Sequence, residues 1–208
     1  MNLVQISLTN RCNLSCDYCP IKPWRNNPDY PNKLTNEKLF LLLERLDPKE
    51  WAIELTGGEP ALYSELDELL YWLQANGFCG LVKTNGTLPI RKVPSFKIIA
   101  AFHNLNNPPQ YFDEILIINH TSDSESKIKW CRERKVPFQV IERDTYSKPA
   151  SKEDKSDCKI MFVTPEGHKS ECNAGTQRVP LEEAEIPSRD ACSGCKTFKD
   201  FNVFFRDI

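Results

Sequence analysis

Short apolar runs rich in β-branched residues alternate with amphipathic stretches through about residue 145. This alternation is typical of consecutive strand and helix units that form a parallel sheet. Six strands are expected, over residues 4–8, 51–56, 81–83, 96–102, 115–118 and 138–141. The pattern therefore predicts an α/β fold.

Two helices have recognisable ends. Thr35 is placed to cap a helix whose leucines recur on one face. Ser64 and Asp67 have the spacing of a capping box for the next helix, which is expected to end at Asn76-Gly77.

Two later connections are poor in helix-forming residues. Residues 87–95 contain two prolines, and residues 104–113 carry the run Asn106-Asn107-Pro108-Pro109. Parallel strands usually need a crossover of a dozen or more residues. Helices are expected to be short or absent there, while a third helix is predicted around residues 126–134. The helical layer outside the sheet is thus predicted to be incomplete.

Composition limits the size of the domain, the kinds of partner and the cellular compartment that are expected. The 208 residues suit one full core with a small appendage, and 40% hydrophobic content is ordinary for a soluble chain. A net charge of -2 argues mildly against binding nucleic acid by bulk electrostatics, although a local basic groove remains compatible. Nine cysteines, without a signal peptide or transmembrane run, indicate metal-bound thiolates in a reducing cytoplasm.

Three cysteines near the start carry the strongest chemical signal. Cys12, Cys16 and Cys19 follow the first predicted strand at the spacing C-x3-C-x2-C. A [4Fe-4S] cube normally takes four thiolates, so a triad leaves one iron free to bind a small molecule. Zinc and disulfides are weaker alternatives, because zinc favours four ligands and disulfides suit small secreted chains.

A second cysteine set lies beyond a change in composition. The chain turns polar from Asp144, which predicts a core over residues 1–145, a linker over 146–157 and a small module over 158–208. Four cysteines of this module lie within 38 residues that are too few and too polar for an independent core. Covalent or metal links are therefore expected to hold it.

Together these motifs resemble one family. RCNLSCDYC, Gly57-Gly58-Glu59-Pro60 and Thr84-Asn85-Gly86 are similar to the cluster motif, the GGEP motif and the third-strand ending of the radical S-adenosylmethionine (radical SAM) superfamily. The resemblance implies a partial (βα)6 TIM-like barrel with trimmed helices, whose site lies at the carboxyl ends of the strands. It also implies that reductive cleavage of SAM gives a 5'-deoxyadenosyl radical that takes a hydrogen atom from the substrate.

The resemblance assigns roles to individual residues. It implies that the three cysteines of the triad are catalytic cluster ligands and that the glycine pair lets backbone approach the SAM ammonium. The expected SAM contacts are Tyr18, Gly57, Gly58, Glu59, Asn85, His103 and Asn104. Alanines stand at 100 and 101, where the family commonly has a ribose-binding serine. His103 and Asn104 are the proposed substitutes, although a lone histidine at a strand end is more often structural.

The C-terminal cysteines resemble a Twitch or SPASM-like auxiliary-cluster module, with Pro165-Glu166-Gly167 as the turn of a hairpin. The resemblance implies a second [4Fe-4S] cluster, and structural zinc is the alternative. Its ligands would be Cys158, Cys172, Cys192 and Cys195. Four cysteine ligands would leave no iron of this cluster open, which favours a role in electron transfer over direct binding of substrate.

Function is expected to follow from the two clusters. We expect a radical SAM oxidoreductase that gives net oxidation of a peptide, a nucleotide or nucleic-acid base, or a carbohydrate. It would take electrons from a donor such as flavodoxin or ferredoxin and need no membrane. The alternatives are a redox-neutral isomerase or epimerase, with Cys79 or Cys131 as a hydrogen donor, a non-catalytic iron-sulfur electron carrier or redox sensor, and a zinc-stapled scaffold.

Overall fold

The structure, a computed structural model, describes residues 2–17, 19, 21–29, 34–119, 123–142, 160–170 and 179–181. The helical elements are α1 (Asn36–Leu43), the 3-10 turn η1 (Pro60–Leu62), α2 (Leu66–Ala75) and α3 (Ser124–Arg134). The strands are β1 (Asn2–Ser7), β2 (Trp51–Thr56), β3 (Gly80–Thr84), β4 (Phe96–Ala101), β5 (Glu114–Asn119), β6 (Phe138–Glu142), β7 (Ile160–Val163), β8 (His168–Ser170) and β9 (Val179–Pro180).

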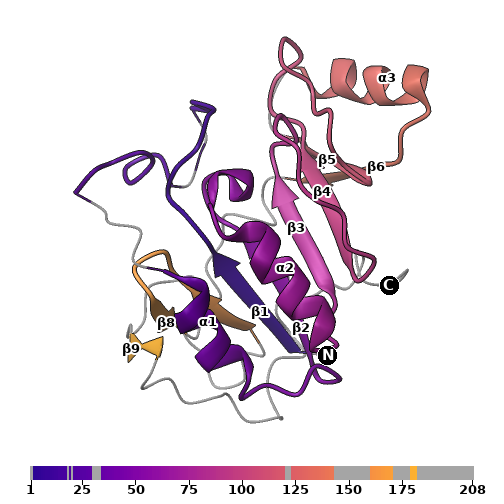
Figure 1. The fold of residues 1–208 in the computed structure, drawn as a ribbon. Helices are drawn as coiled ribbons and strands as arrows, with labels where there is room; N and C mark the ends of the chain where they lie inside the picture. Colours follow the sequence, from indigo (N-terminus) through magenta and orange to yellow (C-terminus); the bar gives the residue numbers. More distant parts are fainter. Residues whose placement is uncertain are drawn as a thin grey trace, which may run out of the picture.

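These strands form one sheet in the order β6-β5-β4-β3-β2-β1-β7-β8-β9 (Figure 1). Strands β1 to β6 pair in parallel with their sequence neighbours, which confirms the six predicted strands. Strand β7 adds a seventh parallel strand beside β1, and β8 and β9 continue antiparallel. The sheet curves without closing, so the fold is the predicted partial barrel.

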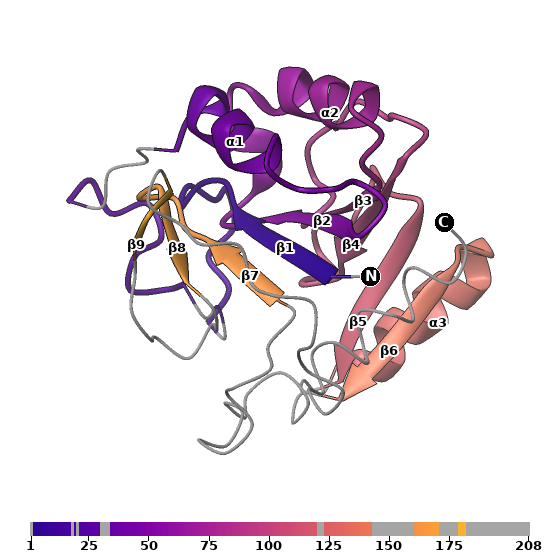
Figure 2. The same cartoon turned by 90° about the horizontal axis from the view of Figure 1, so that it is seen from below.

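Helices α1 and α2 cover the same face of the strands around β1 and β2 (Figures 1 and 2). Thr35 caps α1 as predicted, since its side chain accepts the Lys38 N–H at 3.4 Å. The predicted capping box of α2 is wrong: Glu65 occupies the cap position, and no side chain caps this helix. The Glu65 carboxylate instead accepts the Asn36 N–H at 2.8 Å, so it satisfies the start of α1.

The incomplete helical layer is confirmed. Residues 85–95 and 102–113, which join β3 to β4 and β4 to β5, form no helix. Helix α3 packs near β5, and its Cys131 forms a buried cluster with Phe102, Ile115 and Ile117. Of the three connections between β3 and β6, only the one between β5 and β6 therefore contains a helix.

The sheet face turned away from α1 and α2 carries polar groups between apolar ones. Leu3, Ala52 and Leu81 form part of its apolar cluster. Glu54, which is 1% exposed, shares this face by strand alternation and pairs with Lys83 at 3.0 Å. The barrel interior is thus partly lined by a buried ion pair.

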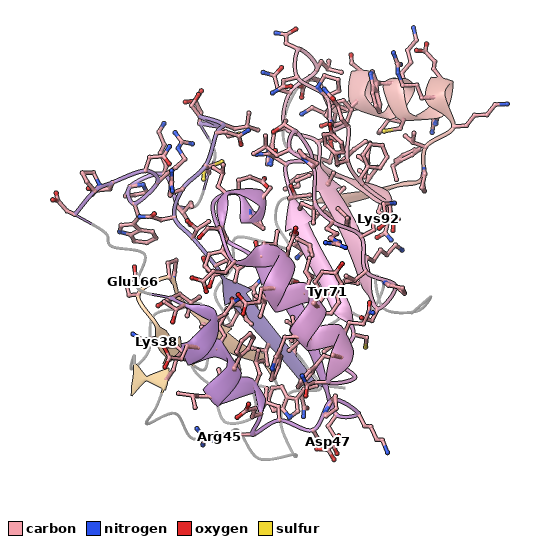
Figure 3. The ribbon with its side chains drawn as sticks, in the orientation of Figure 1. Lys38, Arg45, Asp47, Tyr71, Lys92 and Glu166 are labelled. Carbon is pink, nitrogen blue, oxygen red and sulfur yellow. The ribbon has the colours of Figure 1, made fainter. Side chains whose placement is uncertain are left out.

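The described part of the C-terminal segment belongs to the same core. Met161, Val163 and Leu181 are buried with the side chains beneath α1 and α2. The predicted turn is confirmed by the antiparallel β7–β8 pair and by Gly167, whose φ is +77°. Figure 3 shows Glu166 of this turn beside Lys38 of α1. Sheet pairing therefore holds β7 to β9, while the predicted linker 146–157 lies outside the described residues.

Candidate functional site: the three-cysteine loop

The three cysteines lie on the loop that leaves the carboxyl end of β1 (Figure 1). Cys12, Cys16 and Cys19 are half-buried cysteines outside any disulfide bond. Thr9 and Asn10, which begin the loop, are buried. The loop is thus anchored at its start and accessible at its thiols, as a site that must receive a metal cluster requires.

Local contacts shape the chemistry of Cys12. The Leu14 N–H donates to the Cys12 Sγ at 3.4 Å, a contact that stabilises a thiolate. Burial raises the pKa of the Cys12 thiol above its ordinary value, the Leu14 contact lowers it, and the charge of Glu59 raises it further. Iron binds the thiolate, so loading this site must release protons.

Three thiols on one loop, with an N–H directed at one sulfur, fit a cluster that takes three protein ligands. Among the described residues, no group of three His, Cys, Asp or Glu side chains is placed to hold a single metal ion. A cube differs from such a site, because each of three irons takes its own thiolate.

The glycine pair after β2 packs directly against this loop. The Gly58 N–H donates to the Thr9 carbonyl at 2.6 Å, and the Glu59 N–H donates to the Arg11 carbonyl at 2.7 Å. A Cβ on Gly58 would lie 2.2 Å from the Arg11 carbonyl oxygen, and one on Gly57 would lie 2.6 Å from that of Thr9. The cysteine loop can therefore approach this turn closely only because both residues are glycines. The sequence alone did not reveal this packing role of the glycine pair.

Glu59 is fully buried and anchors two strand ends to each other. Its Oε1 accepts the Ala61 N–H at 3.0 Å and the Thr84 hydroxyl at 2.6 Å, and its Oε2 accepts the Asn85 N–H at 2.8 Å. The carboxylate thus joins the GGEP turn to the end of β3. Its expected contact with SAM stays a prediction.

Asn85 extends this connection to the cysteine loop. Its Nδ2 donates to the Oδ1 of Asn13 at 2.8 Å, while its Oδ1 accepts the N–H and the hydroxyl of Thr87. Asn13 in turn donates to the Thr87 hydroxyl at 2.8 Å. Asn13 lies between Cys12 and Cys16, so the network fixes the loop across 72 residues of sequence. Sequence reasoning missed both Asn13 and Thr87.

The remaining candidates after β4 are less directly placed. His103 is half-buried, whereas Asn104 is exposed and its Oδ1 accepts the Asn106 N–H at 2.8 Å within a turn. Ile117 of β5 lies in the buried cluster that also contains Cys131 of α3. Ile141 of β6 packs against the opposite face of the sheet. The ribose contact is still a prediction.

Five predicted site residues lie outside the described part of the chain: Tyr18, Cys158, Cys172, Cys192 and Cys195.

The fold and this loop define a class of parallel α/β proteins that carry a three-thiol site after the first strand. Residues 6–141 match the family described as the Radical SAM superfamily. The chain therefore belongs to the radical SAM superfamily, which carries a [4Fe-4S] cluster and SAM.

Sequence relatives include the GTP 3',8-cyclase of Sulfurimonas denitrificans, 42% identical over 34% of this chain and 22% of that protein. The 7-carboxy-7-deazaguanine synthase of Clostridium acetobutylicum is 34% identical over 44% of this chain and 41% of that protein. The match thus covers about a fifth of one relative's length and about two fifths of the other's.

Solved structures support the fold alone. Histidine-tagged anSMEcpe with bound AdoMet matches with a TM-score of 0.62 at 14% identity, covering 88% of this chain and 78% of that one. Streptococcus suis SuiB bound to precursor peptide SuiA matches with a TM-score of 0.58 at 12% identity, covering 88% and 63%. Among the described residues, no helix is both long and apolar enough to cross a membrane.

Proposed function

We propose that this protein is a radical SAM enzyme that abstracts a hydrogen atom from its substrate and gives net oxidation. Cys12, Cys16 and Cys19 would hold the SAM-binding cluster, which supplies the reductive cleavage of SAM when bound. The observation that carries the proposal is the bracing of the cysteine loop. Gly58 and Asn85 hold it from two different strand ends, an arrangement that leaves all three thiols half-buried.

Net oxidation depends on the second cysteine set, whose placement is a proposal. A substrate that loses a hydrogen atom must lose one more electron and a proton to become an oxidised closed-shell product. A fully ligated cluster at Cys158, Cys172, Cys192 and Cys195 would accept that electron. Support comes from the antiparallel β7–β8 pair, in which Phe162 lies opposite Ser170. Cys158 precedes β7 in the sequence and Cys172 follows β8.

The redox-neutral alternative loses some support. Cys131 is a fully buried residue of α3. Cys79 lies before the start of β3, at the end of the strand away from the cysteine loop. Neither is placed to donate a hydrogen atom to a substrate near Cys12. An epimerase would therefore need a donor other than these two cysteines.

The substrate class remains open among peptides, nucleotides or bases, and carbohydrates. The sequence relatives favour nucleotides as the first class to assay, because one is named for GTP and another for a deazaguanine. The same proposal includes an external electron donor such as flavodoxin or ferredoxin. It also includes a cytoplasmic location, which suits the five cysteines that stand outside disulfide bonds among the described residues.

Anaerobic reconstitution tests the proposal. The wild-type protein should bind about eight irons and form 5'-deoxyadenosine from SAM after reduction. Cys12→Ala should abolish this product, whereas Cys79→Ala, which changes a cysteine away from the loop, should retain it. Replacing Cys158, Cys172, Cys192 and Cys195 together by alanine should leave about four irons and SAM cleavage, but lose net substrate oxidation.

Three outcomes would count against the proposal. Absence of 5'-deoxyadenosine from protein that carries its iron would favour the electron carrier. A substrate product of unchanged mass would favour isomerisation. Zinc in place of iron at the C-terminal cysteines would remove the electron acceptor.

A further inference from the structure

The segment that follows the third cysteine folds back over the cysteine loop. Residues 21–27, here called the return turn, are closed by bonds from the N–H groups of Trp24 and Arg25 to the Ile21 carbonyl, at 2.9 and 2.8 Å. The Asn27 N–H donates to the Trp24 carbonyl at 3.2 Å. The return turn is therefore a compact unit.

The return turn supplies a hydrogen-bond donor to the backbone carbonyl of each cysteine in the triad. The Lys22 N–H donates to Cys19 at 3.1 Å, the Arg25 guanidinium to Cys16 at 3.2 Å, and the Asn26 Nδ2 to Cys12 at 2.8 Å. One short segment thus restrains the main chain at all three ligands.

Asn26 makes the most complete of these contacts. Besides donating to the Cys12 carbonyl, it accepts the Cys12 N–H at its Oδ1, at 2.9 Å. A single amide side chain therefore satisfies both backbone groups of one ligand. The two bonds fix the orientation of the Cys12 backbone, and with it the direction of its Cα–Cβ bond.

The backbone of Asn26 is specialised for this position. Its φ is +56°, in the left-handed region that asparagine tolerates better than most residues. Its own N–H donates to the Asn10 carbonyl at 3.1 Å, and the buried Asn10 donates from Nδ2 to the Trp24 carbonyl at 3.1 Å. Both the conformation and the amide of Asn26 are thus used to join the return turn to the loop before Cys12.

We infer that Asn26 is a positioning residue that presents Cys12 to the cluster before iron arrives. The inference rests on the proposed function, since it assigns a role in the same site. Ordering the backbone in advance reduces the conformational entropy lost when the cluster binds. Asn26 therefore acts on how fast the triad loads and how long it retains iron, with no contact to substrate.

Asn26→Gly isolates this role. Glycine adopts a positive φ freely, so the variant removes both side-chain bonds without adding backbone strain. Lys135→Gly is the matched control, because Lys135 is the other non-glycine residue with positive φ in the described chain, at the end of α3. Both variants relieve the same backbone conformation, and only one touches the loop.

In anaerobic protein reconstituted with iron and sulfide, we expect Asn26→Gly to lose cluster iron to a chelator about tenfold faster than wild type. Its reduced cluster should also show an altered electron paramagnetic resonance signal on adding SAM. Lys135→Gly should match wild type in both measurements. The melting temperatures of the metal-free proteins should show that both variants remain folded.

The outcomes separate the inference from the proposed function. A wild-type protein that takes up no iron overturns both. Wild-type protein that loads a cluster, with an Asn26→Gly variant that retains iron and signal equally well, overturns the inference alone. Should Asn26→Gly fail to fold, Asn26→Asp decides, because it keeps the acceptor for the Cys12 N–H and loses the donor to its carbonyl. Unchanged iron retention in that variant overturns the inference.

Discussion

Replacing Glu59 by glutamine removes the charge on which three hydrogen-bond donors converge, two of them buried. An amide can keep the Ala61 N–H and the Thr84 hydroxyl on its oxygen, but its NH2 group must then face the Asn85 N–H, now 2.8 Å from Oε2. A buried donor left without an acceptor costs about 1–3 kcal/mol, and losing the charge weakens the other two bonds. We expect Glu59→Gln to lower the free energy of unfolding by about 3 kcal/mol.

Denaturant unfolding of the metal-free protein measures this loss, which corresponds to a decrease in melting temperature of about 10 °C for a chain of this size. The control is Glu44→Gln, an exposed site at the end of α1, where a change within about 0.5 kcal/mol is expected. A Glu59→Gln variant of wild-type stability with weakened SAM binding would refute the reasoning. Glu59 would then contact SAM, as the motif alone suggests.

Three further changes test other parts of the structure. Glu54→Gln removes the carboxylate that pairs with the partly buried Lys83 ammonium and should cost about 2 kcal/mol in denaturant unfolding. The double variant with Lys83→Met should recover most of that loss, and equal losses in the two variants would contradict the pairing. Gly58→Ala forces the Arg11 carbonyl to move, so the iron content should fall from about eight toward about four per chain by colorimetric assay. Full loading would show that the loop adapts. Burial raises the pKa of the Cys131 thiol from its ordinary 9.0 to about 11. As pH rises, the unfolded chain therefore releases this proton before the folded chain does, which favours unfolding. The free energy of unfolding in urea should fall more for wild type than for Cys131→Ala between pH 9 and about 11. An equal fall in the two proteins would contradict this.

Local patterns were sufficient for most of the fold. The strands are continuous apolar runs, Thr35 precedes an amphipathic helix, and prolines interrupt residues 87–95, so each prediction used neighbouring residues. The capping box failed because spacing does not say where a carboxylate or hydroxyl points. Glu65 takes the cap position of α2, yet its side chain serves Asn36, 29 residues earlier. Tertiary competition of this kind has no signature in the local sequence.

The candidate site shows the same division. The triad is visible because its cysteines are close in sequence and chemically distinctive. Asn13 and Thr87 are ordinary polar residues 74 positions apart, and they become partners only because β1 and β3 end at the same edge of the sheet. The position of β7 was also hidden, because its four residues follow a polar stretch and pair with β1 across most of the chain.

The contacts of the cysteine loop imply an order of dependence between folding and cofactor binding. Glu59 holds the end of β3, Asn85 carries that constraint to Asn13, and Asn26 holds Cys12 from the other side. None of these bonds involves iron, so each of them can form before the cluster binds. Variants that break them should reduce the retention of iron more than they reduce the stability of the metal-free chain, since the thiols contribute to the cluster and little to the core. Glu59 should be the exception, because its carboxylate is itself part of the buried structure.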